Sequence, residues 1–169
     1  STSIPMFNPQ DLVDNVRRRL RGGDVKELKP FYRGFKGQIT MQADGSFTTH
    51  GVFSQAGTSV TISELPVGSW SSPYKRFLEG LVEKKQISSY TEACTDVDVL
   101  FVVQVTDEGS SRQQIEQLLK LVTTQKTSNM HAFDADGNIR LYSNAAGIEA
   151  AHFACRFAAY SERRRHLIG

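Results

Sequence analysis

The sequence has few of the features that mark several large classes of protein. It contains only two cysteines, Cys94 and Cys155, and their spacing matches neither a metal site nor a CxxC redox motif. Two thiols in a chain of this size indicate a reducing compartment, the cytosol or the nucleus. No apolar run approaches the roughly 18 residues that a membrane-spanning helix needs, and no signal-peptide pattern opens the chain. We therefore expect a soluble protein without a membrane partner.

Motifs of common enzyme chemistry are also missing. The sequence has no P-loop, no GxGxxG, no GxSxG and no HExxH or HxxxH pair. His152 is interpreted as a packed residue of an apolar helix rather than as a ligand. The stretch DADGN begins like a calcium loop, but Ala145 stands at the twelfth position, where that loop needs a bidentate Glu. A hairpin turn is the better interpretation, and no metal site is predicted.

Charge is nearly balanced but unevenly placed. The formal net charge is only +2, which by itself says nothing about nucleic acid, and 39% of the residues are apolar, enough for a core. The arginines, however, cluster near both ends of the chain: Arg17, Arg18, Arg19 and Arg21 at one end, and Arg163, Arg164 and Arg165 at the other. From the residues alone we predict a domain with two basic ends and an anionic partner.

The first helix is predicted from Asn8, a good N-cap, and Pro9, which suits the first helical position, to Gly22-Gly23, which ends it. Its apolar residues Leu12, Val13, Val16 and Leu20 share one arc of the helical wheel. The four arginines lie away from that arc. The helix is therefore amphipathic with a basic outer side, for which a merely solvated face is the alternative interpretation.

The rest of the chain mixes hairpins and helices. Strands are predicted at 37–42 and 46–53, which form a hairpin around Asp44-Gly45. Further strands are predicted at 59–65, at 96–105 as a central strand, and in a second hairpin over 130–142. Helices are predicted at 73–84, 110–121 and 144–166. This order favours an α+β fold, with helices packed on a mixed or antiparallel sheet and a long terminal helix, over a doubly wound parallel sheet.

Four stretches together resemble eukaryotic-type DNA topoisomerase II, a type IIA enzyme. They are STSIPMFNPQDLVDNVRRRL, PFYRGFKGQI, ISELPVGSWSSPYKRFLEGL and LVTTQKTSNMHAFDADGNIRLY, and they occur in the family's order over nearly the whole chain. SELPVGSW and SNMHAFD are the most specific of them. Three positions depart from the family's usual residues: Ser69 stands where Thr is usual, Gly68 where Arg or Ala is frequent, and Arg76 where Glu is usual. These departures put individual polar contacts of that loop in doubt.

The resemblance implies an organisation in three parts. Residues 1–22 would be a basic helix that follows the cleavage domain, residues 23–143 the α/β plait-like tower, and residues 144–169 the start of the coiled-coil arm. In the family, the Ile of the ST-x-IP motif wedges between base steps of the gate DNA and helps to bend it. Ile4 occupies that place here. An apolar side chain suits this role because it can replace the stacking contact that the bases lose at a kink. The alternative is that Ile4 packs on the domain.

The resemblance also implies that the chain is a fragment without catalytic residues. The family's tyrosine nucleophile, its magnesium-binding acidic cluster and its ATPase domain lie upstream of the matching region. The whole enzyme would be a homodimer that uses Mg²⁺ and ATP to break both strands of one duplex, pass another through and reseal the break. Its location would be the nucleus, or the cytoplasm if the enzyme is viral.

Double-stranded DNA is the expected partner, and phosphate supplies most of the affinity in such an interface. Beside the arginines of the first helix, Arg33 and Lys36 are predicted to bind phosphate, because Gly34 and Gly37 would let the backbone approach an anion. Lys75 is a further candidate from the PYK stretch. Two alternatives stay open: a scaffold module that does not touch DNA, and a standalone enzyme with an unrecognised site.

Overall fold

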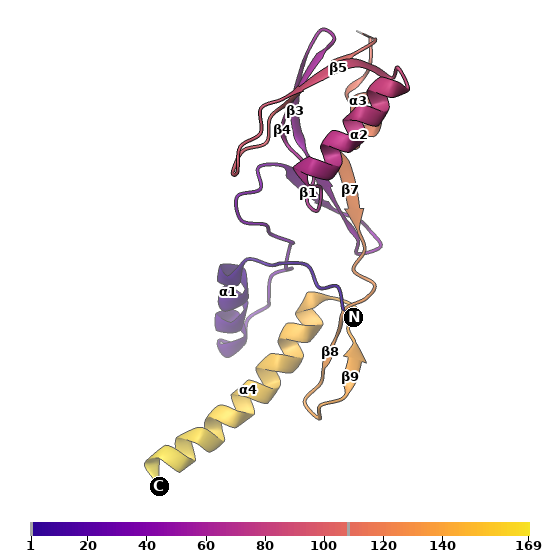
Figure 1. Ribbon diagram of the computed structural model, residues 1–169. Coiled ribbons are helices and arrows are strands. Elements are labelled where there is room, and N and C mark those ends of the chain that lie inside the picture. The colour runs from indigo at the N-terminus through magenta and orange to yellow at the C-terminus, as the bar shows by residue number, and fades with distance from the viewer. Residues whose placement is uncertain (1, 108) are drawn as a thin grey trace. The chain divides into compact units, whose positions relative to one another are not determined.

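The computed structural model describes residues 2–107 and 109–169. The chain divides into two compact units (Figure 1). The first comprises the stretch up to Arg33 together with Ala43–Ser46 and Lys126–Gly169, and the second comprises Gly34–Gln42 and Phe47–Gln125. Each unit has its own elements, and each is described by itself below.

The second unit contains two antiparallel sheets. One has the strand order β1-β2-β7, with bounds Gln38–Met41, Phe47–His50 and Val122–Gln125. The other has the order β3-β4-β6-β5, with bounds Val52–Ala56, Ser59–Glu64, Phe101–Val105 and Ile87–Glu92. The helices α2 (Ser71–Glu83) and α3 (Arg112–Leu118) belong to the same unit. Each pairing within these two sheets is antiparallel, so the predicted α+β fold class is confirmed.

The core lies between one face of the four-stranded sheet and both helices. Val60, Ile62, Phe101 and Val103 alternate along β4 and β6 and are fully buried, because successive side chains of a strand point to opposite faces. Leu78 of α2 and Ile115 of α3 belong to the same cluster. The buried hydroxyl of Tyr74 donates a hydrogen bond to the carbonyl oxygen of Leu119 at 2.7 Å, which satisfies a polar group that would be costly to bury alone.

Gly51 divides a segment that the sequence predicted as a single strand over 46–53. Residues on its two sides enter different sheets: β2 pairs with β1 and β7, whereas β3 pairs with β4. The amide of Gly51 donates to the carbonyl oxygen of Leu121 at 2.8 Å, and a Cβ at this position would lie 2.5 Å from the carbonyl oxygen of Glu64. The close approach of another backbone therefore requires glycine where the chain leaves one sheet for the next.

Two predicted elements are shorter than expected. The central strand was expected over 96–105, but β6 begins at Phe101 because Thr95 and Asp98 close a turn. In that turn the Asp98 amide donates to Thr95 Oγ1 at 3.0 Å. The helix expected to reach Leu121 ends at Leu118, and Lys120 then adopts a positive φ of 49°. The central position of β6, between β4 and β5, is confirmed.

The first unit contains α1 (Pro9–Leu20), the hairpin of β8 (His131–Phe133) and β9 (Ile139–Leu141), and α4 (Ala145–Ile168). The Asn8 side chain accepts from the Gln10 amide and Pro9 opens the helix, as predicted. Asn144 caps α4 by accepting from the Gly147 amide at 2.9 Å. The turn DADGN closes the hairpin, with Asp134 Oδ1 accepting from the amides of Asp136 and Asn138. The hairpin interpretation of this stretch is confirmed.

The long helix α4 has no buried residue. His152 is exposed, so its interpretation as a packed residue was wrong. Phe153 and Phe157, one turn apart, stack on each other with ring centroids 5.7 Å apart, and Phe157 and Tyr160 are each 55% exposed. Ile148 and Phe153 of the same helix are half-buried.

Candidate nucleic-acid interface

The face of α1 that packs against its own unit is not the apolar arc predicted from the sequence. Its single buried residue is Asn15, whereas Val13 and Leu20 of the predicted apolar arc are 44% and 58% exposed. Residues three and four apart share a helix face, so Arg19 lies on the same side as Asn15. The side chain of Arg19 is accordingly only 23% exposed. Arg17, Arg18 and Arg21 are exposed, as the sequence predicted for all four arginines.

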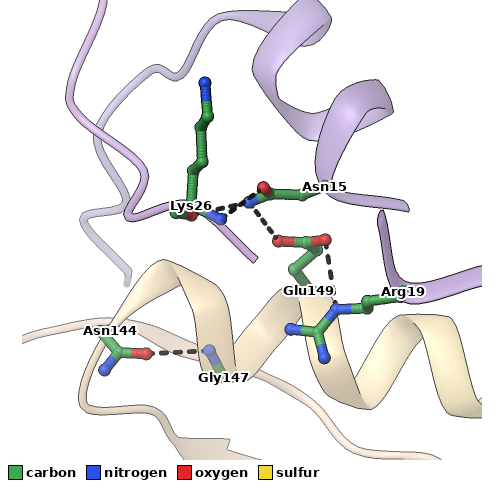
Figure 2. A network of polar contacts seen from close by, with 6 residues as sticks. All are labelled: Asn15, Arg19, Lys26, Asn144, Gly147 and Glu149. Carbon is green, nitrogen blue, oxygen red and sulfur yellow. Dashed lines mark hydrogen bonds and ion pairs between the residues drawn. The ribbon is translucent and has the colours of Figure 1, made fainter. Parts of the chain in front are cut away.

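Asn15 is the centre of a polar network that ties α1 to two other segments (Figure 2). Its side-chain oxygen accepts from the Lys26 amide and its Nδ2 donates to the Lys26 carbonyl oxygen, both at 2.9 Å. The same Nδ2 donates to Glu149 Oε2 of α4 at 3.3 Å. The other carboxylate oxygen of Glu149 accepts from Arg19 Nε at 3.4 Å. Every polar atom of the buried Asn15 amide is therefore used.

A groove of about 620 Å³ lies between α1 and the segment 23–29. The basic residues that line it are Arg17, Arg18, Arg21, Lys26 and Lys29. Asp11, Asp14 and Glu27 line it too, and Asp14 forms a 3.3 Å ion pair with Arg17. Arg18 and Arg21 form no ion pair with any described residue, so their guanidinium groups are available to an outside anion. The groove is thus cationic, and among its basic residues only Arg17 forms an ion pair with another described residue.

Sequence reasoning missed Lys26 and Lys29 as members of this groove. They lie in a segment without regular secondary structure, so no helical or strand period placed them beside the arginines. A signal was present in the sequence, since the stretch DVKELK directly follows the basic helix. The sequence signal could not show that the segment 24–29 contacts α1. This contact depends on the hydrogen bonds between the Asn15 side chain and the backbone of Lys26.

The other predicted phosphate ligands, Arg33, Lys36 and Lys75, are not among the residues that line this groove. Arg33 and Lys36 are exposed and belong to different units. Lys75 on α2 donates to Glu92 of β5 at 3.0 Å, and this hydrogen bond raises the pKa of Lys75. Glycine is needed at position 37 for a different reason from the one expected. A Cβ there would collide with the His50 carbonyl oxygen and the Phe35 ring. Packing within the protein, rather than an approaching anion, requires this glycine.

Ile4 lies in a segment of the first unit without regular secondary structure and is 41% exposed. The residues before it contact the stretch around Asn129, where the Ser3 amide and Thr2 Oγ1 donate to the Asn129 carbonyl oxygen at 2.8 and 3.0 Å. After it, the carbonyl oxygen of Met6 accepts from the Phe31 amide at 2.8 Å. Two of the stretches that suggested a resemblance, 1–20 and 121–142, therefore touch at this point.

Among residues 2–107 and 109–169, no three His, Cys, Asp or Glu side chains gather at a possible metal site. None of the helices in the described part of the chain is both long enough and apolar enough to cross a lipid bilayer.

Comparison with known proteins relates the chain to DNA topoisomerases. The sequence matches the family of DNA gyrase/topoisomerase IV A-type subunits over residues 1–169. It is 34% identical over 180 residues to the DNA topoisomerase-like protein cin-4 of Caenorhabditis elegans, covering 100% of this chain and 21% of that protein. It is also 34% identical to DNA topoisomerase 2 of Arabidopsis thaliana, covering 99% of this chain and 12% of the relative.

A solved structure agrees with the sequence comparison. The DNA-binding, cleavage and re-ligation domain of Plasmodium falciparum topoisomerase II superposes with a TM-score of 0.92 at 30% identity. The match covers 99% of this chain and 24% of that one. The chain thus spans only 12% to 24% of the length of these three chains. With the match over residues 1–169, these likenesses show that the chain belongs to the DNA gyrase/topoisomerase IV family and is of the eukaryotic topoisomerase II type.

Proposed function

We propose that this chain is the part of a type IIA DNA topoisomerase that binds and bends the gate duplex. The observation that carries the proposal is the cationic groove beside α1, in which Arg18 and Arg21 have no acidic partner among the described residues. Lys26 and Lys29 add two further cations along the same groove. Such an arrangement fits a row of backbone phosphates, which bind largely through charge and release of counterions.

The bend is assigned to Ile4. A side chain that unstacks a base step must be apolar, must protrude and must be held in place. Ile4 is apolar and 41% exposed, and hydrogen bonds hold the chain on both sides of it. Pro5 directly after it restricts the backbone further, since the ring fixes φ. Bending in turn lets a basic surface reach more phosphates.

The activity of a whole enzyme built around this chain follows from the same family. It would break both strands of one duplex, pass a second duplex through, and reseal the break, acting as a homodimer in the nucleus, or in the cytoplasm if viral. Mg²⁺ and ATP would be bound by parts of the enzyme other than this chain. Within it, residues 1–22 would form the helix next to the cleavage domain, residues 23–143 the tower, and residues 144–169 the start of the arm.

The first test is fluorescence anisotropy of a labelled duplex, about two helical turns long, titrated with the 169-residue chain over a series of salt concentrations. We expect binding that weakens with salt, with a slope of about 0.9 in log–log units per phosphate contact. Ile4→Ala should weaken binding, and Lys84→Gln, which changes an exposed lysine outside the groove, should not. Absence of binding at low salt would contradict the proposal and favour the scaffold alternative.

A further inference from the structure

The segment that carries Ile4 is fastened at two places to different parts of its unit. On the N-terminal side the Thr2 hydroxyl has a double role: its Oγ1 donates to the Asn129 carbonyl oxygen and accepts from the His131 amide, both at 3.0 Å. The Ser3 amide donates to the same Asn129 carbonyl at 2.8 Å. On the C-terminal side Met6 accepts from the Phe31 amide at 2.8 Å.

The receiving stretch is itself held in shape. The imidazole Nδ1 of His131 and the side-chain Oδ1 of Asn129 are 2.8 Å apart, which closes a short turn around Met130. Met130 is 2% exposed and its carbonyl oxygen accepts from the Tyr142 amide at 2.9 Å. His131 then begins β8, which pairs with β9. Thr2 is therefore fastened to a fixed hairpin rather than to a mobile loop.

We propose that Thr2 is a positioning residue for Ile4, acting through its hydroxyl on the 129–131 turn; this inference rests on the proposed function of Ile4 in bending DNA. Of the three hydrogen bonds on the N-terminal side, two use the Thr2 Oγ1, so a single side chain controls most of that attachment. The attachment on the far side of Ile4 uses only backbone groups of Met6 and Phe31.

The physical reason is conformational entropy. An exposed apolar side chain on an unfastened strand samples many orientations, and only a fraction of them enters a base step. The apparent dissociation constant of the bent complex rises as the inverse of that fraction. Loss of two hydrogen bonds at an exposed place corresponds to a roughly tenfold smaller competent fraction. Because water can replace the lost partners there, the fold itself should be preserved.

The matched variants are Thr2→Val, which keeps the shape and removes the hydroxyl, and Thr2→Ser, which keeps the hydroxyl. Bending is measured by energy transfer between dyes at the two ends of a short duplex, and affinity by anisotropy. We expect Thr2→Val to lower the bent population about tenfold and Thr2→Ser to behave like the unchanged chain, whereas Ile4→Ala should abolish bending. In an Ile4→Ala background, Thr2→Val should have no further effect on bending.

A second measurement on the free protein makes the inference independent of DNA. In Thr2→Val the His131 amide should exchange with solvent faster, and the NMR order parameter of the Ile4 δ-methyl group should fall; in Thr2→Ser both should be retained. If Ile4→Ala leaves bending unchanged, the proposed function fails, whatever Thr2 does. If Ile4→Ala abolishes bending while Thr2→Val changes neither bending nor methyl order, the role of Thr2 is overturned and the function stands.

Discussion

Arg19 Nε and Glu149 Oε1 lie 3.4 Å apart although 130 residues separate them in the chain. The Glu149 side chain is only 7% exposed, so its charge needs a partner. Arg19 and the amide of Asn15 together supply that partner (Figure 2). The ion pair joins the basic helix α1 to the long helix α4. Arg19 thereby differs from the other arginines of α1, because they have no buried acidic partner in the described part of the chain.

This pair predicts opposite effects for two neighbouring arginines. Arg18→Ala should reduce the slope of log affinity for DNA against log salt by about 0.9 and leave the free energy of unfolding within about 0.5 kcal/mol. Arg19→Ala should lower that free energy by about 1–3 kcal/mol, because Glu149 loses a charged donor, and leave the slope unchanged. Salt-dependent anisotropy and urea unfolding measure both. A drop in slope for Arg19→Ala equal to that of Arg18→Ala would contradict this expectation and support the phosphate role predicted for Arg19 from the sequence.

Substitution of Asn15 should lower stability more than substitution at a surface position of a helix usually does. Asn15→Ala should destabilise the chain by about 2 kcal/mol, since it leaves the amide and carbonyl of Lys26 and the carboxylate of Glu149 without this partner. Gln10→Ala is the matched control, because Gln10 lies on the same helix but its amide contacts only the exposed Asp14. Urea unfolding followed by circular dichroism compares them. Equal midpoints for the two variants would show that the network contributes nothing to stability.

Two glycines predict opposite responses to the same substitution. Gly51→Ala should destabilise by more than about 1 kcal/mol, because the new Cβ would lie 2.5 Å from a backbone oxygen. Gly80→Ala, within α2 and with nothing within 4 Å of its Cβ, should stabilise by about 0.5–1 kcal/mol through the helix propensity of alanine. Thermal unfolding distinguishes the two. A stable Gly51→Ala variant would argue against the close approach of the Glu64 backbone.

Asp44 predicts a sensitivity to acid at the first hairpin turn. The Ser46 hydroxyl donates to Asp44 Oδ1 at 2.6 Å and the Ser46 amide at 2.9 Å, and these bonds hold the pKa of Asp44 below its usual 3.8. The folded pKa is the lower one, so the stabilisation is present above pH 3.8 and is lost as pH falls through the folded value. Ser46→Ala, which removes the main cause, should flatten the fall of the urea midpoint between about pH 5 and pH 2. An unchanged pH profile in Ser46→Ala would contradict this assignment.

Much of the local structure could be predicted because it depends on neighbours in the sequence. The Asn8-Pro9 helix start, the Asp44-Gly45 hairpin and the β8–β9 hairpin follow from capping and turn chemistry within a few residues. The strands β5 and β7 were not predicted. The sequence ISSYTE of β5 has few buried residues, since this strand lies at the edge of its sheet, and the four residues of β7 are too short for a clear alternation.

For the candidate interface, the sequence by itself determined which residues carry charge and that α1 is a helix with several arginines, because helix capping and the 3.6-residue period are local properties. Only the tertiary structure decided which side of α1 is covered. The apolar arc that the period suggested is partly exposed, and the buried position belongs to Asn15. A helical wheel cannot show that a carboxylate from 130 residues away pairs with Arg19. Pairing and burial depend on which segments meet in space, and so they decide which cations remain free for a partner.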